Sequence, residues 1–259
     1  MSSQPRTRRA SAVSASLTLA RRSWLKIYHV PEQLADAILI PVLFTVMFTY
    51  LFGGALAGST DEYLHFLLPG SLVMSVLLIT GYAGTNLNSD KTRGTFDRFR
   101  SMPIWRPALI VGGLISDVGR NLLAAAIVLG LGLVMGFRPD GGPTGVALAV
   151  GLLLVFAFGL SWVWALLGLT LRSANAVTMT SFLVQFPLVF ASNVFVDPDT
   201  MPGWLQAFVD VNPVSHLVTA VRGLIHGVPA GGDILLVLIA SGLIVAVFAP
   251  ITMHVYRRG

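Results

Sequence analysis

The residues of this chain best suited to recognising another molecule lie between positions 88 and 106. Five of the seventeen basic residues fall there, although only 11% of the 259 residues are charged. Gly94 and Pro103 bracket about two helical turns, on which Phe96 and Phe99 share one face beside charged side chains. An aromatic ridge with a charged rim suits the cleft of a protein partner. The alternative is that both rings pack against the chain's own helices or lie in a membrane interface.

Other residue types that support catalysis are absent or poorly spaced. The sequence has no cysteine, and its five histidines show no metal-ligand spacing. Neither Lys26 nor Lys91 follows the glycine-rich turn of a phosphate-binding loop, so the chain is not expected to hydrolyse ATP itself. We therefore expect no catalytic residue, metal or cofactor on this chain. Its net charge of +5 reflects membrane topology and does not indicate a nucleic-acid partner.

Apolar runs of membrane-spanning length recur along the whole sequence. The composition is 54% hydrophobic, with a mean hydropathy of +0.77. This pattern predicts an all-α polytopic membrane protein with a single domain over residues 1–259. The third predicted span is too long for a bilayer, so its first part, with Asp117 and Arg120 as an ion pair, is expected to project into the cytoplasm. The six expected transmembrane helices are residues 33–56, 64–87, 107–137, 145–171, 174–196 and 233–255.

The segments outside these helices carry the orientation signal. Six spans put both termini on one side, which then holds fourteen of the seventeen basic residues, so both termini are expected in the cytoplasm. Residues 1–32 are expected to form a cytoplasmic tail and an interfacial helix. On that helix Trp24 and Tyr28 would lie at the depth of the lipid headgroups, with Arg21 and Arg22 on another face. Residues 88–106 would form a cytoplasmic loop.

Residues 197–232 are too polar to span a membrane, yet they have helical periodicity. Asn212 suits a helix N-cap, and Pro213 suits the first helical position. An apolar stripe follows, with Arg222 on the opposite face. We expect an amphipathic helical hairpin at the outer membrane face, between the fifth and sixth spans.

The fifth span contains polar side chains that could line a transport route. Ser181 and Gln185 are four residues apart and share a helical face, and Asn193 follows them. The alternative is that these side chains form hydrogen bonds between helices. Apolar spans with scattered polar groups and no buried charge cluster suit an amphipathic or hydrophobic cargo.

Several short motifs occur in a specific order along the chain. They include Phe66, Pro69, Gly70, Arg93, Gly94, Phe96, Arg98, Arg100, Pro103, Arg106, Asp117, Arg120, Asn212, Pro213, Arg222, Gly223 and Gly227. Together they resemble the ABC-2 type transporter permeases, most closely the daunorubicin/doxorubicin-resistance branch. The resemblance covers nearly the whole chain.

This resemblance implies the membrane subunit of an ATP-driven exporter in a bacterial cell membrane. It also implies a second permease copy or a paralogue, and cytoplasmic ABC ATPase subunits that hold ATP and Mg. The interfacial helix would be the elbow helix, and the cytoplasmic loop would carry the coupling helix that enters the ATPase. The residues assigned to coupling are Arg93, Gly94, Phe96, Asp97, Arg98, Phe99, Arg100 and Pro103. Met102 and Trp105 depart from the leucine and the small residue common in the family.

The implied cargo is a drug, a secondary metabolite or a lipid. An ion-coupled secondary transporter is the alternative function. It would require carboxylates near the middle of the membrane, and only Asp36 is a candidate.

Overall fold

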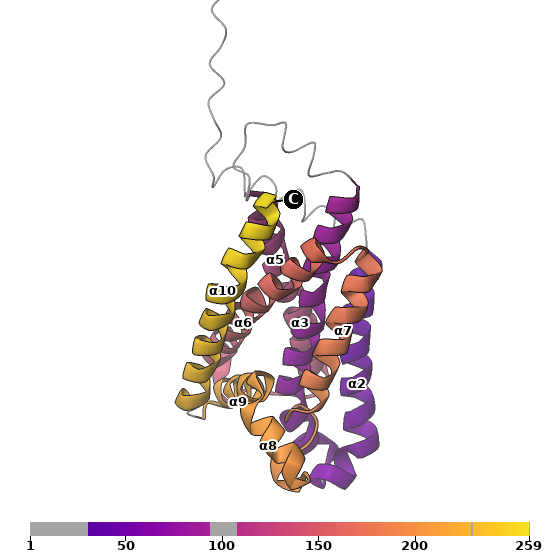
Figure 1. The fold of residues 1–259 in the computed structure, drawn as a ribbon. Helices are drawn as coiled ribbons and strands as arrows, with labels where there is room; N and C mark the ends of the chain where they lie inside the picture. Colours follow the sequence, from indigo (N-terminus) through magenta and orange to yellow (C-terminus); the bar gives the residue numbers. More distant parts are fainter. Residues whose placement is uncertain (1–30, 94–107, 229, 259) are drawn as a thin grey trace, which may run out of the picture.

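The computed structural model describes residues 31–93, 108–228 and 230–258, and every regular element within them is helical (Figure 1). Five long apolar helices in these ranges could cross a membrane. They are α2 (Pro31–Ala57), α3 (Thr60–Thr92), α5 (Ala108–Val134), α6 (Gly142–Thr170) and α10 (Gly231–Arg258). The shorter elements are α7 (Ala174–Phe190), the 3-10 turn η1 (Pro198–Thr200), α8 (Gly203–Val211) and α9 (Pro213–His226).

Helix α3 lies at the centre of the bundle. It contacts α2, α5, α6, α7 and α9, and 83% of the residues in its apolar 18-residue stretch are buried. In the corresponding stretch of α10, only 11% of the residues are buried. An apolar surface of that kind is what a lipid bilayer would cover, so α3 is an inner helix and α10 a peripheral one.

The contact between α3 and α6 depends on two glycines. A Cβ atom added at Gly84 would lie 2.2 Å from the Trp164 carbonyl oxygen, and one added at Gly168 would lie 2.4 Å from the Gly84 carbonyl oxygen. These are backbone atoms that cannot rotate away. Small residues at both positions therefore allow the two helices to touch along their backbones.

Two predicted boundaries around the cytoplasmic loop differ from the structure. The second predicted span, 64–87, lies inside α3, which begins at Thr60 and continues to Thr92. Residues 88–92 are therefore helical and do not belong to a loop. Their polar sequence resembles a loop, but Asn88 is buried against α6. The third predicted span, 107–137, is α5, which ends at Val134, shortly before Gly136 adopts a positive φ of 106°.

The fifth predicted span, 174–196, is wrong at its C-terminal end. Helix α7 has 17 residues and stops at Phe190, so it measures about 26 Å against a hydrocarbon core of ~30 Å. Four of residues 191–196 are apolar (Ala191, Val194, Phe195 and Val196), which is why hydropathy alone extended the helix. Their path is set by partners from α3: the Tyr63 hydroxyl donates to the Phe195 carbonyl oxygen at 2.9 Å, and Gly70 leaves room for Val194.

The polar segment after α7 contains the short helices α8 and α9. As predicted, Asn212 is the N-cap of α9 and Pro213 its first residue. Gly227, with a φ of 70°, ends α9 in the left-handed conformation that glycine tolerates. Figure 1 places α8 and α9 at the end of the bundle away from the C terminus.

Candidate functional site

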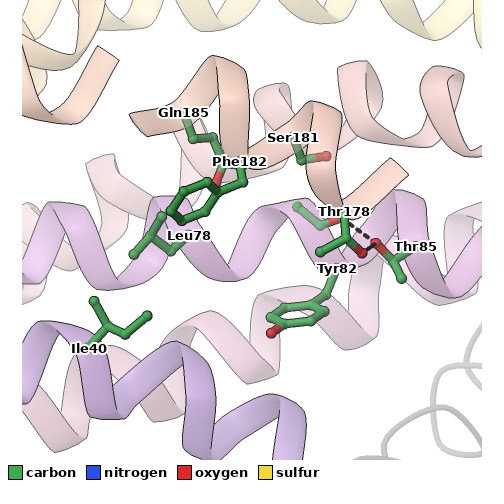
Figure 2. A pocket seen from close by; sticks show the side chains of 9 residues that line it. Ile40, Leu78, Tyr82, Thr85, Thr178, Ser181, Phe182 and Gln185 are labelled. Atoms are coloured by element: carbon green, nitrogen blue, oxygen red, sulfur yellow. Dashed lines mark hydrogen bonds between the residues drawn. The ribbon is translucent and has the colours of Figure 1, made fainter. Parts of the chain in front are cut away.

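A partly open pocket of about 90 Å³ lies between α2, α3 and α7 (Figure 2). Most of its wall is apolar, and Figure 2 shows Ile40, Leu78 and Phe182 around the same space. The polar groups come from α3 and α7. The lining residues are Ile40, Leu78, Gly81, Tyr82, Thr85, Thr178, Ser181, Phe182 and Gln185.

Helix α7 presents a narrow stripe of side chains to this pocket and to α3. Its buried residues are Val177, Ser181, Gln185 and Val189, which are spaced four apart. The predicted sharing of one face by Ser181 and Gln185 is thus confirmed. Phe182, Leu183 and Phe186 lie outside this stripe and are 42–73% exposed. Only a small part of α7 therefore packs against the rest of the chain.

Gln185 and Ser181, two polar residues on α7, differ in their hydrogen bonds. The Gln185 side-chain amide donates to the Thr80 hydroxyl across the helix contact, at 3.4 Å. The same hydroxyl accepts from the Trp164 indole at 2.9 Å and donates to the Leu77 carbonyl oxygen. The Ser181 hydroxyl is buried and has no hydrogen-bond partner within the described parts of the chain. Gln185 thus helps join helices, whereas Ser181 offers an unused hydroxyl at the pocket.

The sequence did not indicate the threonines of the pocket. The hydroxyls of Thr85 on α3 and Thr178 on α7 are 3.0 Å apart, as the dashed line in Figure 2 shows. Thr178 lies three residues before Ser181 and could have been found from that helical spacing. No comparable signal in the sequence connects Thr85 to α7, because 93 residues separate the two threonines.

Asn193 lies away from the pocket. Its side-chain amide donates to the Thr219 hydroxyl at 2.8 Å, and its backbone carbonyl oxygen accepts from Arg222 at 3.0 Å. Because α7 has already ended, Asn193 cannot continue the face of Ser181 and Gln185. It joins the turn after α7 to α9.

Arg222 fastens α9 to the first part of α3. Its guanidinium donates to the Phe66 carbonyl oxygen at 3.1 Å and lies 4.0 Å from the centre of the Phe66 ring. Burial lowers the pKa of Arg222 to about 10, and the nearby Asp197 carboxylate partly offsets this effect. The side chain is therefore still charged at neutral pH, as its contacts with carbonyl oxygens and an aromatic ring favour.

Asn212 links the end of α7 to the start of α9. Its side-chain oxygen accepts from the Val214 backbone N–H at 2.9 Å, as an N-cap does. Its side-chain amide donates to the carbonyl oxygens of Leu188 and Ala191, at 2.8 and 2.9 Å. The sequence predicted the cap but not these bonds to α7, which satisfy carbonyls that the helix end leaves free.

Two histidines of α9 form hydrogen bonds with neighbouring segments. His216 is 2.8 Å from an Asp233 carboxylate oxygen and 3.0 Å from the Asp210 carbonyl oxygen. His226 contacts the Asp140 carboxylate and the His65 carbonyl oxygen. All four partners are acceptors, so each ring makes both bonds only when both nitrogens carry a proton. Within the described ranges, no three His, Cys, Asp or Glu side chains come together as a metal site.

The predicted ion pair on α5 is confirmed. An Asp117 carboxylate oxygen is 2.8 Å from an Arg120 guanidinium nitrogen, and both side chains are buried. The two charges offset each other within one helix, so this carboxylate is not an isolated membrane charge.

Most of the predicted coupling and elbow residues lie outside the described residues. Arg93 is described: it is exposed and caps the end of α3. The remaining predicted coupling residues, Gly94, Phe96, Asp97, Arg98, Phe99, Arg100 and Pro103, fall in the range 94–107, which is not described. The elbow residues Arg21, Arg22, Trp24 and Tyr28 fall in the range 1–30, which is not described either.

The architecture is that of an α-helical membrane protein with a pocket among its spans, and comparison with known proteins gives its family. The family model of the ABC-2 type transporter matches residues 15–226. The chain belongs to the ABC-2 type transporter family, which confirms the resemblance seen in the sequence. It is a permease subunit of an ATP-binding-cassette transporter.

Three relatives illustrate the breadth of this family. The chain is 51% identical to the daunorubicin resistance ABC transporter permease protein DrrB1 of Streptomyces coeruleorubidus, over 100% of this chain and 91% of the relative. It is 28% identical to the probable doxorubicin resistance ABC transporter permease protein DrrC of Mycobacterium tuberculosis, over 86% and 80%. It is 24% identical to the inner membrane transport permease YadH of Escherichia coli K12, over 87% and 89%.

Proposed function

We propose that this permease exports an amphipathic or hydrophobic cargo (a drug, a secondary metabolite or a lipid) from the cytoplasm. ATP and Mg would be held by a separate ATPase subunit. The observation that carries the proposal is the apolar pocket with a few hydroxyl groups between α3 and α7. Two relatives are named for resistance to daunorubicin and, as probable, to doxorubicin, and these names support a drug as cargo.

The chemistry of the pocket matches such a cargo. Ile40, Leu78 and Phe182 offer apolar contact for a ring system, and Tyr82 adds a second aromatic side chain. The unpartnered Ser181 hydroxyl could bond a polar substituent. Leaving a buried hydroxyl unpaired costs about 1–3 kcal/mol, which a bound cargo would recover.

The size of the pocket requires a further opening step. Its volume of about 90 Å³ is well below the ~300–1,000 Å³ of sites for drug-sized ligands. We propose that α7 moves relative to α3 and that a second permease copy, or a paralogue, completes the route. The exposed apolar side chains of α2 and α7 support this pairing, since they leave a broad apolar surface beside the pocket.

We further propose six spans with both termini in the cytoplasm of a bacterium. Helix α7 would be the fifth and shortest span, and α8 and α9 would form the outer hairpin. Figure 1 draws the C terminus, the end of α3 and the start of α5 at one end of the bundle. The end of α3 carries Lys91 and Arg93, whereas Asp61 and Glu62 lie at its start, which agrees with the preference for basic residues inside.

The segment between α3 and α5 would couple the permease to its ATPase. In this proposal, Gly94–Pro103 forms a short helix whose Phe96 and Phe99 enter a cleft of the ATPase. Residues 15–28 form the elbow helix at the membrane interface. The support comes from the aromatic and basic sequence, from the family, and from the position of Arg93 at the end of α3.

Co-purification tests this function. The chain, tagged and co-expressed with an ABC ATPase from its source organism, should bring the ATPase down and support vanadate-sensitive hydrolysis in lipid. Replacing both Phe96 and Phe99 with serine should reduce recovery of the ATPase. The matched control is Phe208→Ser, an exposed aromatic side chain on α8. Recovery that is equal in all three proteins would refute the coupling assignment.

No observation on the described residues favours an ion-coupled secondary transporter. Asp117, a described carboxylate inside the spanning helix α5, is paired with Arg120. The side chain of Asp36 lies outside the description. An Asp36→Asn variant should retain full export, whereas loss of transport in that variant would restore the alternative.

A further inference from the structure

The last turns of α3 are bonded directly to the C-terminal end of α6. The Asn88 side chain is 0% exposed, and its amide donates to the carbonyl oxygens of Gly168 and Leu171 at 2.9 and 2.8 Å. The Lys91 ammonium donates to the Leu169 carbonyl oxygen. The carbonyls in the last turn of a helix lack partners within the helix, so these bonds complete the end of α6.

This connection belongs to a tightly packed body. It lies one turn beyond the glycine contact of Gly84 with Gly168. An apolar cluster on the same part of the bundle joins α3, α5 and α6, with side chains of α10 packed against it. Among the described side chains, no member of that cluster comes from α2 or α7. The buried members are Ala83, Leu87, Ile110, Leu114, Trp162, Ala165 and Leu169.

Asn88 also reaches the connection between α6 and α7. Leu171, one of its two acceptors, is the C-cap of α6 and is extended, with a ψ of 155°. Ser173, two residues later, is the N-cap of α7 and accepts from the Ala176 backbone N–H. The Asn88 amide therefore bonds to the first residue of the turn between α6 and α7.

We propose that Asn88 is a positioning residue that makes α3 and α6 move as one body and gives α7 a fixed pivot at residues 171–173. The proposal rests on the proposed function, in which the segment directly after α3 contacts the ATPase. A displacement of that segment would shift α3 and α6 together. Helix α7 would turn about the pivot and change the pocket that it forms with α3. Asn88 itself does not touch the cargo.

The first test compares transport with ATP hydrolysis in the same vesicles. The permease and its ATPase are reconstituted in lipid, with doxorubicin as the probe. In Asn88→Ala we expect ATP hydrolysis to continue but doxorubicin moved per ATP to fall about tenfold, since two buried hydrogen bonds are lost. The control is Thr92→Val at the same helix end, because the bonds of the Thr92 hydroxyl to described residues all go to carbonyls of α3 itself. An unchanged transport-to-hydrolysis ratio in Asn88→Ala would overturn the inference.

A second test does not depend on folding of the Asn88 variant. The chain has no cysteine, so spin labels can be placed on cysteine pairs introduced at chosen positions. The distance between labels at Thr92 and Thr170 should be the same in the nucleotide-free and vanadate-trapped complexes. The distance between labels at Thr92 and Met179, an exposed residue of α7, should change. A change in the first distance would overturn the inference.

The proposed function and the role proposed for Asn88 would be contradicted by different results. An unmodified chain that neither binds an ATPase nor moves doxorubicin, daunorubicin or labelled lipid would remove the proposed function and this inference together. A working exporter in which Asn88→Ala transports normally would remove the inference alone.

Discussion

Helix α3 packs more closely against α6 than against α7. Against α6 it has glycine contacts, the Asn88 amide and a shared apolar cluster. Against α7 it has an apolar cluster that includes Val189, a pair of threonine hydroxyls, the Gln185 bond of 3.4 Å and a pocket. Within a close-packed interface a displacement disturbs many contacts, whereas a loosely packed one can rearrange at low cost. The comparison indicates which side of α3 is fixed and which side can move.

The closely packed side is most sensitive to added volume. Gly84→Ala would place a Cβ atom 2.2 Å from the Trp164 carbonyl oxygen, so the helices must separate. We expect the free energy of unfolding to fall by about 1–3 kcal/mol. Unfolding in mixed micelles would measure this loss. The control is Gly151→Ala on α6, where an added Cβ meets nothing within 4 Å and helix propensity should add up to ~1 kcal/mol. Equal stability of the two variants would contradict the close-contact argument.

The far end of α7 should show an intermediate effect. Asn212→Ala removes the cap of α9 and both bonds to α7, so we expect a loss of about 1–2 kcal/mol in the free energy of unfolding. Asn212→Asp retains the acceptor that caps α9 but lacks the amide donors. It should therefore lose only the connection to α7. Hydrogen exchange at the end of α7 would measure the contribution of the amide bonds. If the Asn212→Asp variant protects this end as well as the unmodified chain does, the amide bonds contribute nothing.

Substitutions on the loosely packed side should reduce transport without reducing stability. Ser181→Ala removes a buried hydroxyl without a partner in the described part of the chain, so the free energy of unfolding should not fall. Export of doxorubicin should fall about two- to tenfold if the hydroxyl bonds the cargo. The control is Ser161→Ala on α6, whose hydroxyl bonds to its own helix at Ala157. Matching export by both variants would place the cargo elsewhere.

Local signals in the sequence predicted several features correctly. Asn212 and Pro213 start α9 because a side-chain acceptor and a proline without an N–H suit the first turn of any helix. Ser181 and Gln185 share a face because α-helical periodicity alone requires it. Asp117 and Arg120 form an ion pair for the same reason, being three residues apart. Each of these features depends on residues within about one turn of each other.

Features that depend on distant partners could not be predicted. Hydropathy extended the fifth span to residue 196, but contacts of Tyr63 and Gly70 with Phe195 and Val194 turn the chain earlier. Asn88 looked like the start of a loop, because nothing near it in the sequence indicates an α6 partner 80 residues away. The predicted length of the fifth span placed Asn193 on the same helix as Ser181 and Gln185, whereas its bond to Thr219 joins it to α9.

The sequence by itself determined the class of this protein. Apolar runs long enough to cross a bilayer, helix caps and ordered family motifs are local properties, and they specify an α-helical membrane permease of the ABC-2 family. Tertiary structure decided where α7 ends, which side of α3 is close-packed and where the pocket lies. Those features arise when residues far apart in the chain satisfy each other's buried carbonyl and hydroxyl groups, or leave no room for a Cβ atom, and no local pattern records either condition.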